Sequence, residues 1–401
     1  MTPSTPDQSS YDVIIAGGAM MGASVAWFLS SHPGFDGTIA VIERDPSYEF
    51  CSTTHSNSCM RQQFTTAPNV PVSRFCADYV RNFRAWMGGG ADIPDLPVHA
   101  FGYMYLATTE AGAEVLREAQ ALQAGLGAAT RLLDRAELER EFPMYRADDV
   151  LLASFGPVDE GYFDGHTMCD TWRRKARANG VAFLTGEITA IDRSGERITG
   201  VGLADGRRLG CGALVNATGP RAGRTAAMAG LELPVEPRKR YTFVFDSQQP
   251  LGQDLPLTVD PSGVHVRTDG TGFMAGCPPR DGDPAVAPED FEADHGLWEE
   301  VVWPALYERI PAFEAIRLRR MWVGHYAYNT LDQNALLGPH VEVPNFLLIN
   351  GFSGHGLQQS PAMGRGLAEW IVSGRFETLD LSAFGHDRIG KDRLIVERAI
   401  I

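Results

Sequence analysis

The sequence predicts a mixed fold, in which a parallel α/β domain made of separated chain segments is combined with an α+β domain built on an antiparallel sheet. Three observations predict it. The chain begins with an apolar run, a glycine turn, a helical stretch and a second apolar run. Short apolar segments of the same kind return later, and residues 235–280 alternate between apolar and polar side chains. Such alternation is typical of half-buried antiparallel strands.

Length and charge narrow the class of protein. The chain has 401 residues, of which 44% are hydrophobic, and its formal net charge is −15 at pH 7. This length corresponds to two or three structural units with sizeable cores. An acidic chain without a basic stripe is not expected to bind nucleic acid, because such binding depends on Lys and Arg neutralising phosphates.

The cysteines and the N-terminal residues indicate in which cellular compartment the protein is expected. The six cysteines form neither a CxxC pair nor a His/Cys cluster, so we expect no disulfide framework, no metal site, and a reducing, cytoplasmic location: Cys51, Cys59, Cys76, Cys169, Cys211 and Cys277. Residues 1–10 lack the charged and apolar regions of a signal peptide and are expected to form a disordered tail. The apolar window 13–29 is interrupted by glycines, which argues against a membrane span.

The first elements form a βαβ unit. Residues 11–16 (YDVIIA) and 38–43 (TIAVIE) are β-rich apolar runs, and residues 23–30 between them have helix-forming composition. A βαβ unit implies parallel strands and a right-handed crossover. Three later runs are expected to add strands to the same sheet: residues 181–191, 213–217 and 345–349.

A second domain is expected between these segments. Residues 110–141 have helical spacing, and strands are expected at 241–245, 263–267 and 272–275. Residues 281–300 carry eight acids and no Lys or Arg, which indicates a solvated loop and helix face. The expected boundaries are 11–85, 150–225 and 325–385 for the discontinuous first domain, and 86–149 and 226–324 for the second.

The N-terminal glycine turn indicates a Rossmann-like dinucleotide site. Residues 17–22 (GGAMMG) fit the GxGxxG fingerprint except that Ala19 replaces the second glycine. Gly17 permits the tight turn, Gly22 permits close packing of helix on strand, and the helix N-terminus attracts the diphosphate. Glu43 follows at the distance of a ribose-binding acid. The motif does not choose between FAD and NAD, and the alternative is a glycine turn without a ligand.

A second glycine turn lies near the C-terminus. Residues 350–357 (NGFSGHGL) follow an apolar strand and precede a helical stretch at 363–372. With the N-terminal motif, this run resembles the FAD-dependent D-amino acid oxidase and sarcosine oxidase superfamily, from about Tyr11 to Leu381. The closest resemblance is to the branch of FAD-dependent oxidoreductase domain-containing proteins that includes a mitochondrial member. It rests on CMRQQF (59–64), DEGYFD (159–164), YNTLDQN (328–334) and GFSGHGLQQSP (351–361).

The resemblance implies the fold, a FAD-binding domain beside a substrate domain, and a set of FAD contacts. The turn at Gly354 would place main-chain N–H groups at the pyrimidine side of the flavin, and the backbone of Ile188 would touch the adenine. The bound FAD is expected to be non-covalent. Motif and resemblance together give the expected cofactor-binding residues: Gly17, Gly18, Ala19, Met20, Met21, Gly22, Glu43, Arg44, Ser52, Ile188, Ala217, Thr218, Gly219, Gly351, Gly354, His355, Gly356, Leu357 and Gln358.

The resemblance also implies a substrate site. Arg61 falls where related oxidases hold the substrate carboxylate, and a guanidinium is suited to bidentate capture of that group. The alternative is an arginine paired with a neighbouring acid. Gln358 stands where those oxidases have a second, lysine anchor, so Arg240 or Tyr241 is a candidate replacement. The expected catalytic residues are Arg61, His355, Tyr241 and Tyr326, although His355 could equally have a structural role.

Three departures from the family bear on flavin linkage and electron acceptor. His325 replaces the flavin-linking cysteine of monomeric sarcosine oxidases, and His55 is the alternative for a covalent link. Met274 stands where oxidases carry an O2-activating lysine. This substitution favours a dehydrogenase with another electron acceptor over an oxidase, so that of the two expected acceptors, O2 and a protein or quinone carrier, it favours the carrier.

The resemblance implies amine oxidation. An oxidoreductase of this kind oxidises the C–N bond of a primary or secondary amino-acid-type amine by hydride transfer to flavin N5, and water then hydrolyses the imine. Positioning and desolvation are then the main duties of the protein. Tyr103, Tyr241, His265 and Tyr326 are either walls of this pocket or ordinary core residues. The alternative function is a flavoprotein with a structural FAD that acts as an assembly or scaffolding factor.

Overall fold

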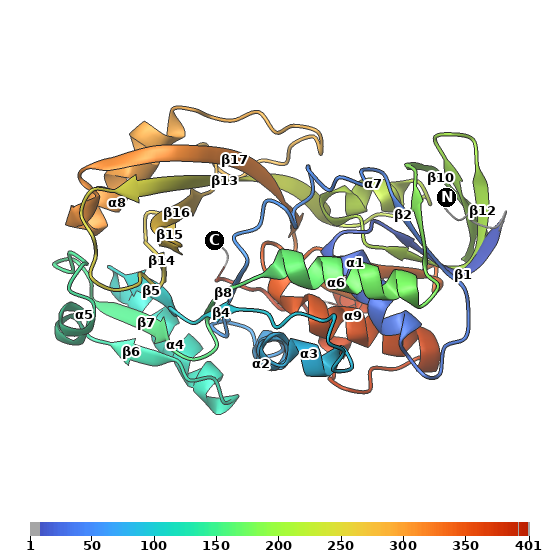
Figure 1. Ribbon diagram of the computed structural model, residues 1–401, viewed down its shortest axis with the longest axis horizontal. Coiled ribbons are helices and arrows are strands. Elements are labelled where there is room, and N and C mark those ends of the chain that lie inside the picture. Colours follow the sequence, from blue (N-terminus) through green and yellow to red (C-terminus); the bar gives the residue numbers. More distant parts are fainter. Residues whose placement is uncertain (1–8, 392, 400–401) are drawn as a thin grey trace.

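The computed structural model describes residues 9–391 and 393–399. Two eight-stranded sheets lie at opposite ends of the molecule, and a small three-stranded sheet is formed by β3 (Cys59–Met60), β4 (Val98–His99) and β8 (Gly161–Phe163) (Figure 1). The expected tail at residues 1–10 lies mostly outside the described residues. Its end was placed too late, because Ser10 already pairs with Gly210 at the start of the first strand.

The first sheet has the order β10-β11-β12-β1-β2-β9, and β19 pairs with β12 and β18. The pairs β1–β2, β1–β12, β2–β9 and β12–β19 are parallel, which confirms the predicted parallel α/β unit. The bounds are β1 Ser10–Ala16, β2 Ile39–Glu43, β9 Ala182–Thr185, β10 Ile188–Ser194, β11 Arg197–Leu203, β12 Arg208–Asn216, β18 Leu336–Pro339 and β19 Phe346–Asn350.

Alternation along β1 covers both faces of this sheet. Val13 and Ile15 pack in one hydrophobic cluster with α1 (Met20–Ser30) and α9 (Gly356–Ser373). Ile14 lies in another cluster, with α7 (Ala222–Ala227). Helices α6 (Gly165–Ala178), α2 (Asn69–Arg81) and α3 (Phe83–Trp86) lie beside α1 and α9 (Figure 1).

The second sheet has the order β17-β13-β16-β15-β14-β5-β7-β6 and is antiparallel except at β14–β5. It confirms the predicted antiparallel domain. Its strands are β5 Tyr103–Ala107, β6 Arg131–Leu133, β7 Leu152–Gly156, β13 Val235–Ser247, β14 Leu257–Val259, β15 His265–Asp269, β16 Gly272–Cys277 and β17 Ile316–Asn329. Its helices are α4 Glu110–Gly125, α5 Arg135–Glu141 and α8 Trp303–Arg309. Shorter helical turns are η1 Gly219–Arg221, η2 Trp298–Val302, η3 Pro311–Phe313, η4 Ser382–Phe384 and η5 His386–Lys391.

Chain connections between the sheets bear on the expected domain boundaries, which stay predictions. Strand β7 at Leu152–Gly156 pairs with β5 and β6, so the second sheet reaches past residue 150. Strand β17 runs on to Asn329, past residue 325. Both strands lead the chain out of the second sheet towards the first.

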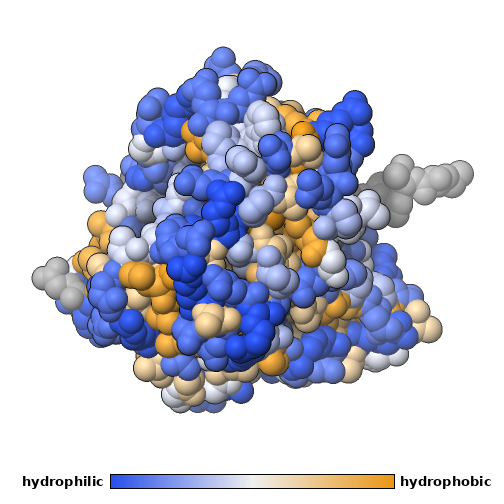
Figure 2. All heavy atoms as spheres, turned by 90° about the vertical axis from the view of Figure 1, so that its left-hand side faces the viewer, coloured by the Kyte–Doolittle hydropathy of each residue, from blue (hydrophilic) through white to orange (hydrophobic). Residues whose placement is uncertain are grey.

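The surface and the thiols complete the description. All six cysteines are free thiols. Within the described ranges, no helix combines the length and apolar character needed to cross a bilayer. The face at the α5 and α8 end is mainly hydrophilic with smaller apolar areas between (Figure 2). Exposed apolar residues include Leu151, Trp303 and Tyr307.

Candidate active site

A cavity of about 530 Å³ lies between the two sheets. One end is bordered by the N-terminal glycine turn, Glu43 and the end of β12, and the other end by strands of the second sheet. Both helix starts that the sequence singled out, at Ala19 and at His355, border it. The cavity is therefore long, and glycine turns from the two ends of the chain meet in it.

The N-terminal turn is tight enough to require glycine. Gly17 has φ +95°, and an added Cβ there would lie 2.6 Å from the Ala217 carbonyl oxygen. At Gly22 an added Cβ would lie 1.8 Å from the Gly17 carbonyl oxygen. Ala19 is the N-cap of α1 and provides no side-chain cap, so the helix start faces the cavity with main-chain N–H groups. This cradle fits a diphosphate.

Glu43 ties the turn to the end of β2. Its carboxylate accepts hydrogen bonds from the main-chain N–H of Gly18 (2.8 Å) and of Asp45 (2.9 Å). A carboxylate can accept further bonds through its remaining lone pairs, so ribose hydroxyls can share it. Arg44, Ile188, Ala217, Thr218 and Gly219 border the same end of the cavity.

The C-terminal turn is held by Tyr326 and Asn329. Ser353 has φ +49° and its hydroxyl accepts the Asn329 N–H at 2.9 Å. At Gly354, φ is +103° and an added Cβ would lie 2.4 Å from the Tyr326 ring. Helix α9 follows without a side-chain cap. Two uncapped helix starts in one long cavity fit FAD, with its diphosphate at α1 and the polar edge of its flavin at α9.

His355 borders the cavity but is a weak base. It is buried, and neither ring nitrogen has a partner among the described residues. Burial, together with the charge of Arg61, lowers the pKa of His355 to about 3. The ring packs edge-on against Phe64, with 5.4 Å between ring centroids. It is therefore neutral, and its packing agrees with the structural role considered for it.

Arg61 is buried at the cavity wall, where β3 ends. Its Nη1 donates to the Gln63 carbonyl and its Nη2 to the Ala399 carbonyl, the latter at 2.5 Å. Its main-chain N–H donates to Gln358 Oε1 at 2.6 Å. In the part of the chain that the structure describes, no carboxylate lies within ion-pair distance of its guanidinium. The alternative of a neighbouring acid partner finds no support there.

The opposite wall comes from β13, β15 and β17. Arg240 forms a two-point pair with Asp283 (2.8 and 2.9 Å), and its guanidinium lies 4.4 Å from the centre of the Tyr326 ring. Its charge is thus balanced, which weakens its candidacy as a second carboxylate anchor. Tyr241 reaches the border of the cavity, but its ring packs in the core of the second sheet with Phe243. Its expected catalytic role stays a prediction.

This wall also contains a polar pair, Asn57 and His265, that no sequence pattern indicated. Asn57 Nδ2 lies 3.0 Å from His265 Nε2, and Thr242 Oγ1 lies 3.5 Å from Asn57 Oδ1. The hydroxyl fixes the amide so that it donates to Nε2, which leaves the proton of His265 on Nδ1. Burial, followed by the charges of Arg240 and Arg267, lowers the pKa of His265 to about 4. His265 is therefore a neutral wall residue.

The acidic run is a largely exposed loop that leads into η2, as the sequence indicated, and several of its acids form ion pairs. Pro288, Glu289 and Phe291 border the cavity, and Phe291 stacks on His325 with 4.3 Å between ring centroids. The paired acids and their cations are Asp283 with Arg240, Glu289 with Arg221 and Arg224, Asp290 with Lys239, and Asp294 and Glu300 with Arg280. All of these cations lie outside residues 281–300, which contain no Lys or Arg themselves.

The remaining predicted residues divide into two groups. Met20, Met21, Ser52, Gly356, Leu357, Gln358, His55, His325 and Tyr103 border the cavity. Gly18, Gly22, Gly351 and Met274 do not border it. The three glycines instead allow close packing or a turn behind the wall, and Met274 contacts Arg267 Nη2 at 3.4 Å.

Comparisons with known proteins agree with this geometry. A family model described as FAD dependent oxidoreductase (DAO) matches residues 12–370. FAD-dependent oxidoreductase domain-containing protein 1 of Xenopus laevis is 36% identical over 425 residues, covering 97% of this chain and 85% of that protein. Mitochondrial sarcosine dehydrogenase of Homo sapiens is 23% identical over 99% of this chain and 44% of its own length.

A solved structure shares the fold. The crystal structure of L-proline dehydrogenase from P. horikoshii superposes with a TM-score of 0.82 at 24% identity, over 96% of this chain and 100% of that chain. The helix starts, the glycine turns and the family match point to one cofactor, FAD. This chain belongs to the DAO family of FAD-dependent oxidoreductases.

Proposed function

We propose that this protein oxidises the C–N bond of a small amino-acid-type amine, with Arg61 holding the substrate carboxylate. One observation carries the proposal: a buried guanidinium at the cavity wall has no carboxylate within ion-pair distance among the described residues, and Glu397 and Glu160 act on it only from farther away. A buried cation is costly unless an anion joins it. An amino acid carboxylate would supply that anion.

The chemistry asks for orientation and a dry site. FAD, when bound, accepts the hydride that leaves the α-carbon of the amine. As the hydride leaves, the nitrogen lone pair forms the C=N bond, and water then adds to the carbon to release the amine and a carbonyl product. Arg61 would orient the α-carbon, and neutral His265, Tyr103 and Tyr326 would form the walls. No charged base is required if the amine enters neutral.

Dehydrogenase action is the form we favour. Among the described residues that border the cavity there is no lysine, although an ammonium group is what assists O2 in the oxidases that this chain resembles. The acceptor would then be a protein or quinone carrier. The similar proteins include a sarcosine dehydrogenase and an L-proline dehydrogenase, which supports this class of activity. The cytoplasmic location stays a prediction.

Anaerobic mixing of the FAD-loaded protein with sarcosine, glycine and L-proline tests the proposal. Bleaching of the oxidised flavin absorbance by any of them is the expected result. Absence of bleaching across a broad panel of amino acids would favour the alternative of a structural FAD in a scaffolding factor. Acid precipitation of the same protein should release all the yellow colour into the supernatant, because we infer a non-covalent flavin.

A further inference from the structure

The chain near its C-terminus returns to Arg61, which borders the cavity. Residues 393–399 follow η5 in the chain. Ala399 supplies the carbonyl that receives Arg61 Nη2 at 2.5 Å. Arg61 and Ala399 are 338 positions apart in the chain. We call residues 393–399 the C-terminal segment.

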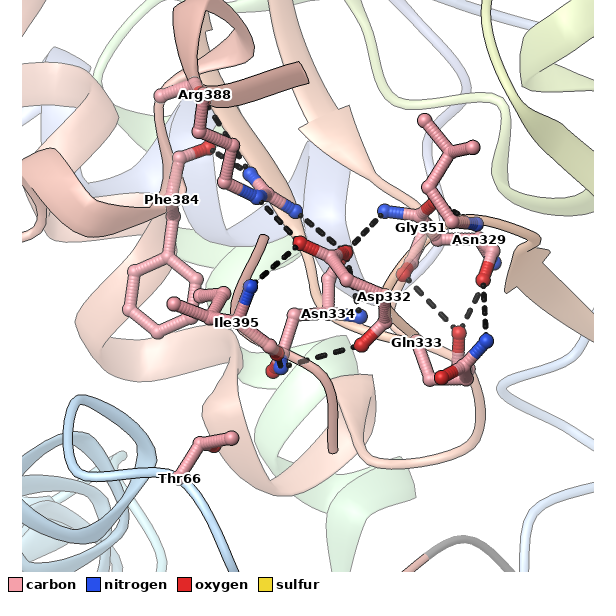
Figure 3. Close-up of polar contacts among 12 residues, drawn as sticks. Thr66, Asn329, Asp332, Gln333, Asn334, Gly351, Phe384, Arg388 and Ile395 are labelled. Atoms are coloured by element: carbon pink, nitrogen blue, oxygen red, sulfur yellow. Dashed lines mark hydrogen bonds and ion pairs between the residues drawn. The ribbon is translucent and has the colours of Figure 1, made fainter. Parts of the chain in front are cut away.

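A buried carboxylate fastens this segment on one side. Asp332 forms a two-point pair with Arg388 (2.7 and 2.9 Å), and its Oδ2 accepts the Ile395 N–H at 3.2 Å (Figure 3). Asn334 donates to the Ile395 carbonyl, and the Glu397 N–H donates to the Asp332 carbonyl at 3.0 Å. The main-chain groups of the C-terminal segment are thus hydrogen-bonded to Asp332 and Asn334.

Glu397 fastens it on the other side. Its side chain is 1% exposed. The carboxylate accepts from the Thr65 N–H (2.9 Å) and hydroxyl (2.6 Å), from the Thr66 hydroxyl (2.7 Å) and from Asn69 Nδ2 (3.2 Å). It also accepts the Ala399 N–H at 3.0 Å. One carboxylate therefore joins Ala399, whose carbonyl accepts the bond from Arg61, to the residues that follow Arg61 in the chain.

We propose that the C-terminal segment forms the back wall of the carboxylate subsite and that Glu397 is the positioning residue for Arg61. This inference rests on the proposed function. Arg61 is held at both terminal nitrogens, by Gln63 and by Ala399. A guanidinium has five N–H donors, so three remain for a substrate. Fixing the plane of the guanidinium aims those donors at a carboxylate in the cavity.

The same network reaches the C-terminal glycine turn. Asn329 Nδ2 donates to Asp332 Oδ1 at 2.9 Å, and the Asn329 N–H donates to the Ser353 hydroxyl at 2.9 Å. Asp332 thus links the back of the carboxylate subsite to the turn that precedes α9 (Figure 3). The distance between carboxylate and flavin, on which hydride transfer depends, is set by one buried cluster.

The test is a titration of the FAD-loaded protein with acetate and, as the neutral isostere, with acetamide, followed by the flavin absorbance. Glu397→Ala should raise the Kd of acetate at least about tenfold and leave that of acetamide unchanged. Glu397→Gln keeps an acceptor oxygen and should recover part of the affinity. Thr66→Val keeps the charge of Glu397 but removes the bond from the Thr66 hydroxyl to Glu397 and the bond that this hydroxyl accepts from Asn69, and should weaken acetate binding by a few-fold. Val396→Ala, an exposed change in the same segment, is the control.

Each outcome decides between claims. Loss of the Glu397 charge alone would tighten acetate binding through Arg61, so unchanged or tighter binding in Glu397→Ala and in Thr66→Val would overturn the positioning role. If Glu397→Ala fails to fold, Thr66→Val alone decides. If the wild type neither responds to acetate nor is reduced by amino acids, the proposed function fails and this inference fails with it. If the wild type does both while the variants bind acetate as it does, only this inference fails.

Discussion

Single residues determine what the cavity can bind. Arg61 is a buried cation whose guanidinium is held by main-chain carbonyls, with no described carboxylate in direct contact, while Glu397 and Glu160 act on its charge from a distance. Glu43 is an acid whose carboxylate already accepts two main-chain N–H groups. The first residue therefore favours an anionic ligand, and the second favours a ligand with hydroxyl groups. FAD and an amino acid together meet both demands.

Replacing Arg61 should impair catalysis without removing FAD. Arg61→Ala is expected to lose about 1.5 to 3 kcal/mol of transition-state binding, or one to two orders of magnitude in kcat/KM. Arg61→Lys should recover only part, because lysine keeps the charge but lacks the planar fork. Rapid reduction kinetics and the flavin-to-protein absorbance ratio measure both quantities. Wild-type reduction by an amino acid in Arg61→Ala, or complete loss of its FAD, would refute the anchor.

Replacing Glu43 should remove the cofactor. Glu43→Arg exchanges an acceptor for a cation, and it also leaves the N–H groups of Gly18 and Asp45 without their partner. We expect purified protein with little or no FAD, measured by the visible absorbance of the oxidised flavin relative to the protein absorbance. Glu49→Arg, an exposed change in the same region, should keep its FAD. Full occupancy in Glu43→Arg would rule out the ribose assignment.

At the scale of elements, the site is built where helices begin. Helices α1 and α9 pack against each other and both start at the cavity, where neither N-cap residue provides a side-chain cap and Thr53 Oγ1 accepts the Met20 N–H of α1 at 3.2 Å. Ser24 of α1 donates to the Ser360 carbonyl of α9 at 2.7 Å. The two positive helix ends are thereby held at a fixed separation, which suits a cofactor with one diphosphate and one flavin.

Close packing at the start of α1 can be tested with a single methyl group. Gly22→Ala places a Cβ 1.8 Å from the Gly17 carbonyl oxygen, which is main chain and cannot rotate away. We expect a loss of about 1 to 3 kcal/mol in unfolding free energy and a lower FAD content. Gly125→Ala at the end of α4 meets nothing within 4 Å and should leave both unchanged or raise stability slightly. Denaturant unfolding with both variants makes the comparison.

Local patterns predicted some elements and missed others for physical reasons. The β1–α1–β2 unit follows from residues adjacent in the chain, so its sequence pattern was sufficient. Helix α9 was expected from residue 363, but it begins at Gly356 and contains Pro361. A proline removes a helix bond, and here the Ser360 hydroxyl donates to the Leu357 carbonyl instead, at 2.8 Å. The contacts of Arg61 with Ala399 and of Asn57 with His265 join distant positions, which no local pattern reports.

At the scale of the whole molecule, buried neutral histidines tie stability to pH. Burial, followed by the charges of His340 and Arg388, lowers the pKa of His386 to about 4. An unfolded histidine has a pKa of about 6.5. Above that pH both states are neutral. As the pH falls from 6.5 towards 4, only the unfolded state takes up the proton, so stability is lost in that window.

Unfolding at two pH values tests this account. Between pH 7 and pH 5, His386 should contribute a loss of about 1 to 2 kcal/mol in unfolding free energy. His386→Gln should show a smaller difference between the two pH values than the wild type does. His295→Gln, a change of an exposed histidine, should match the wild type. An identical pH dependence in His386→Gln and the wild type would contradict the account.

The ribbon of β13 and β17 has a mechanical consequence. The two strands are paired from Val235 opposite Asn329 to Ser247 opposite Ile316, and the same ribbon carries Arg240 and Tyr326 into the cavity wall. The pairing is continuous over this length except for one irregularity between Val244 and Phe245. The ribbon would therefore keep the distance between the two halves of the molecule constant. The protein would then select amines by whether they fit a cavity of constant width, with little contribution from closure of the protein around the substrate.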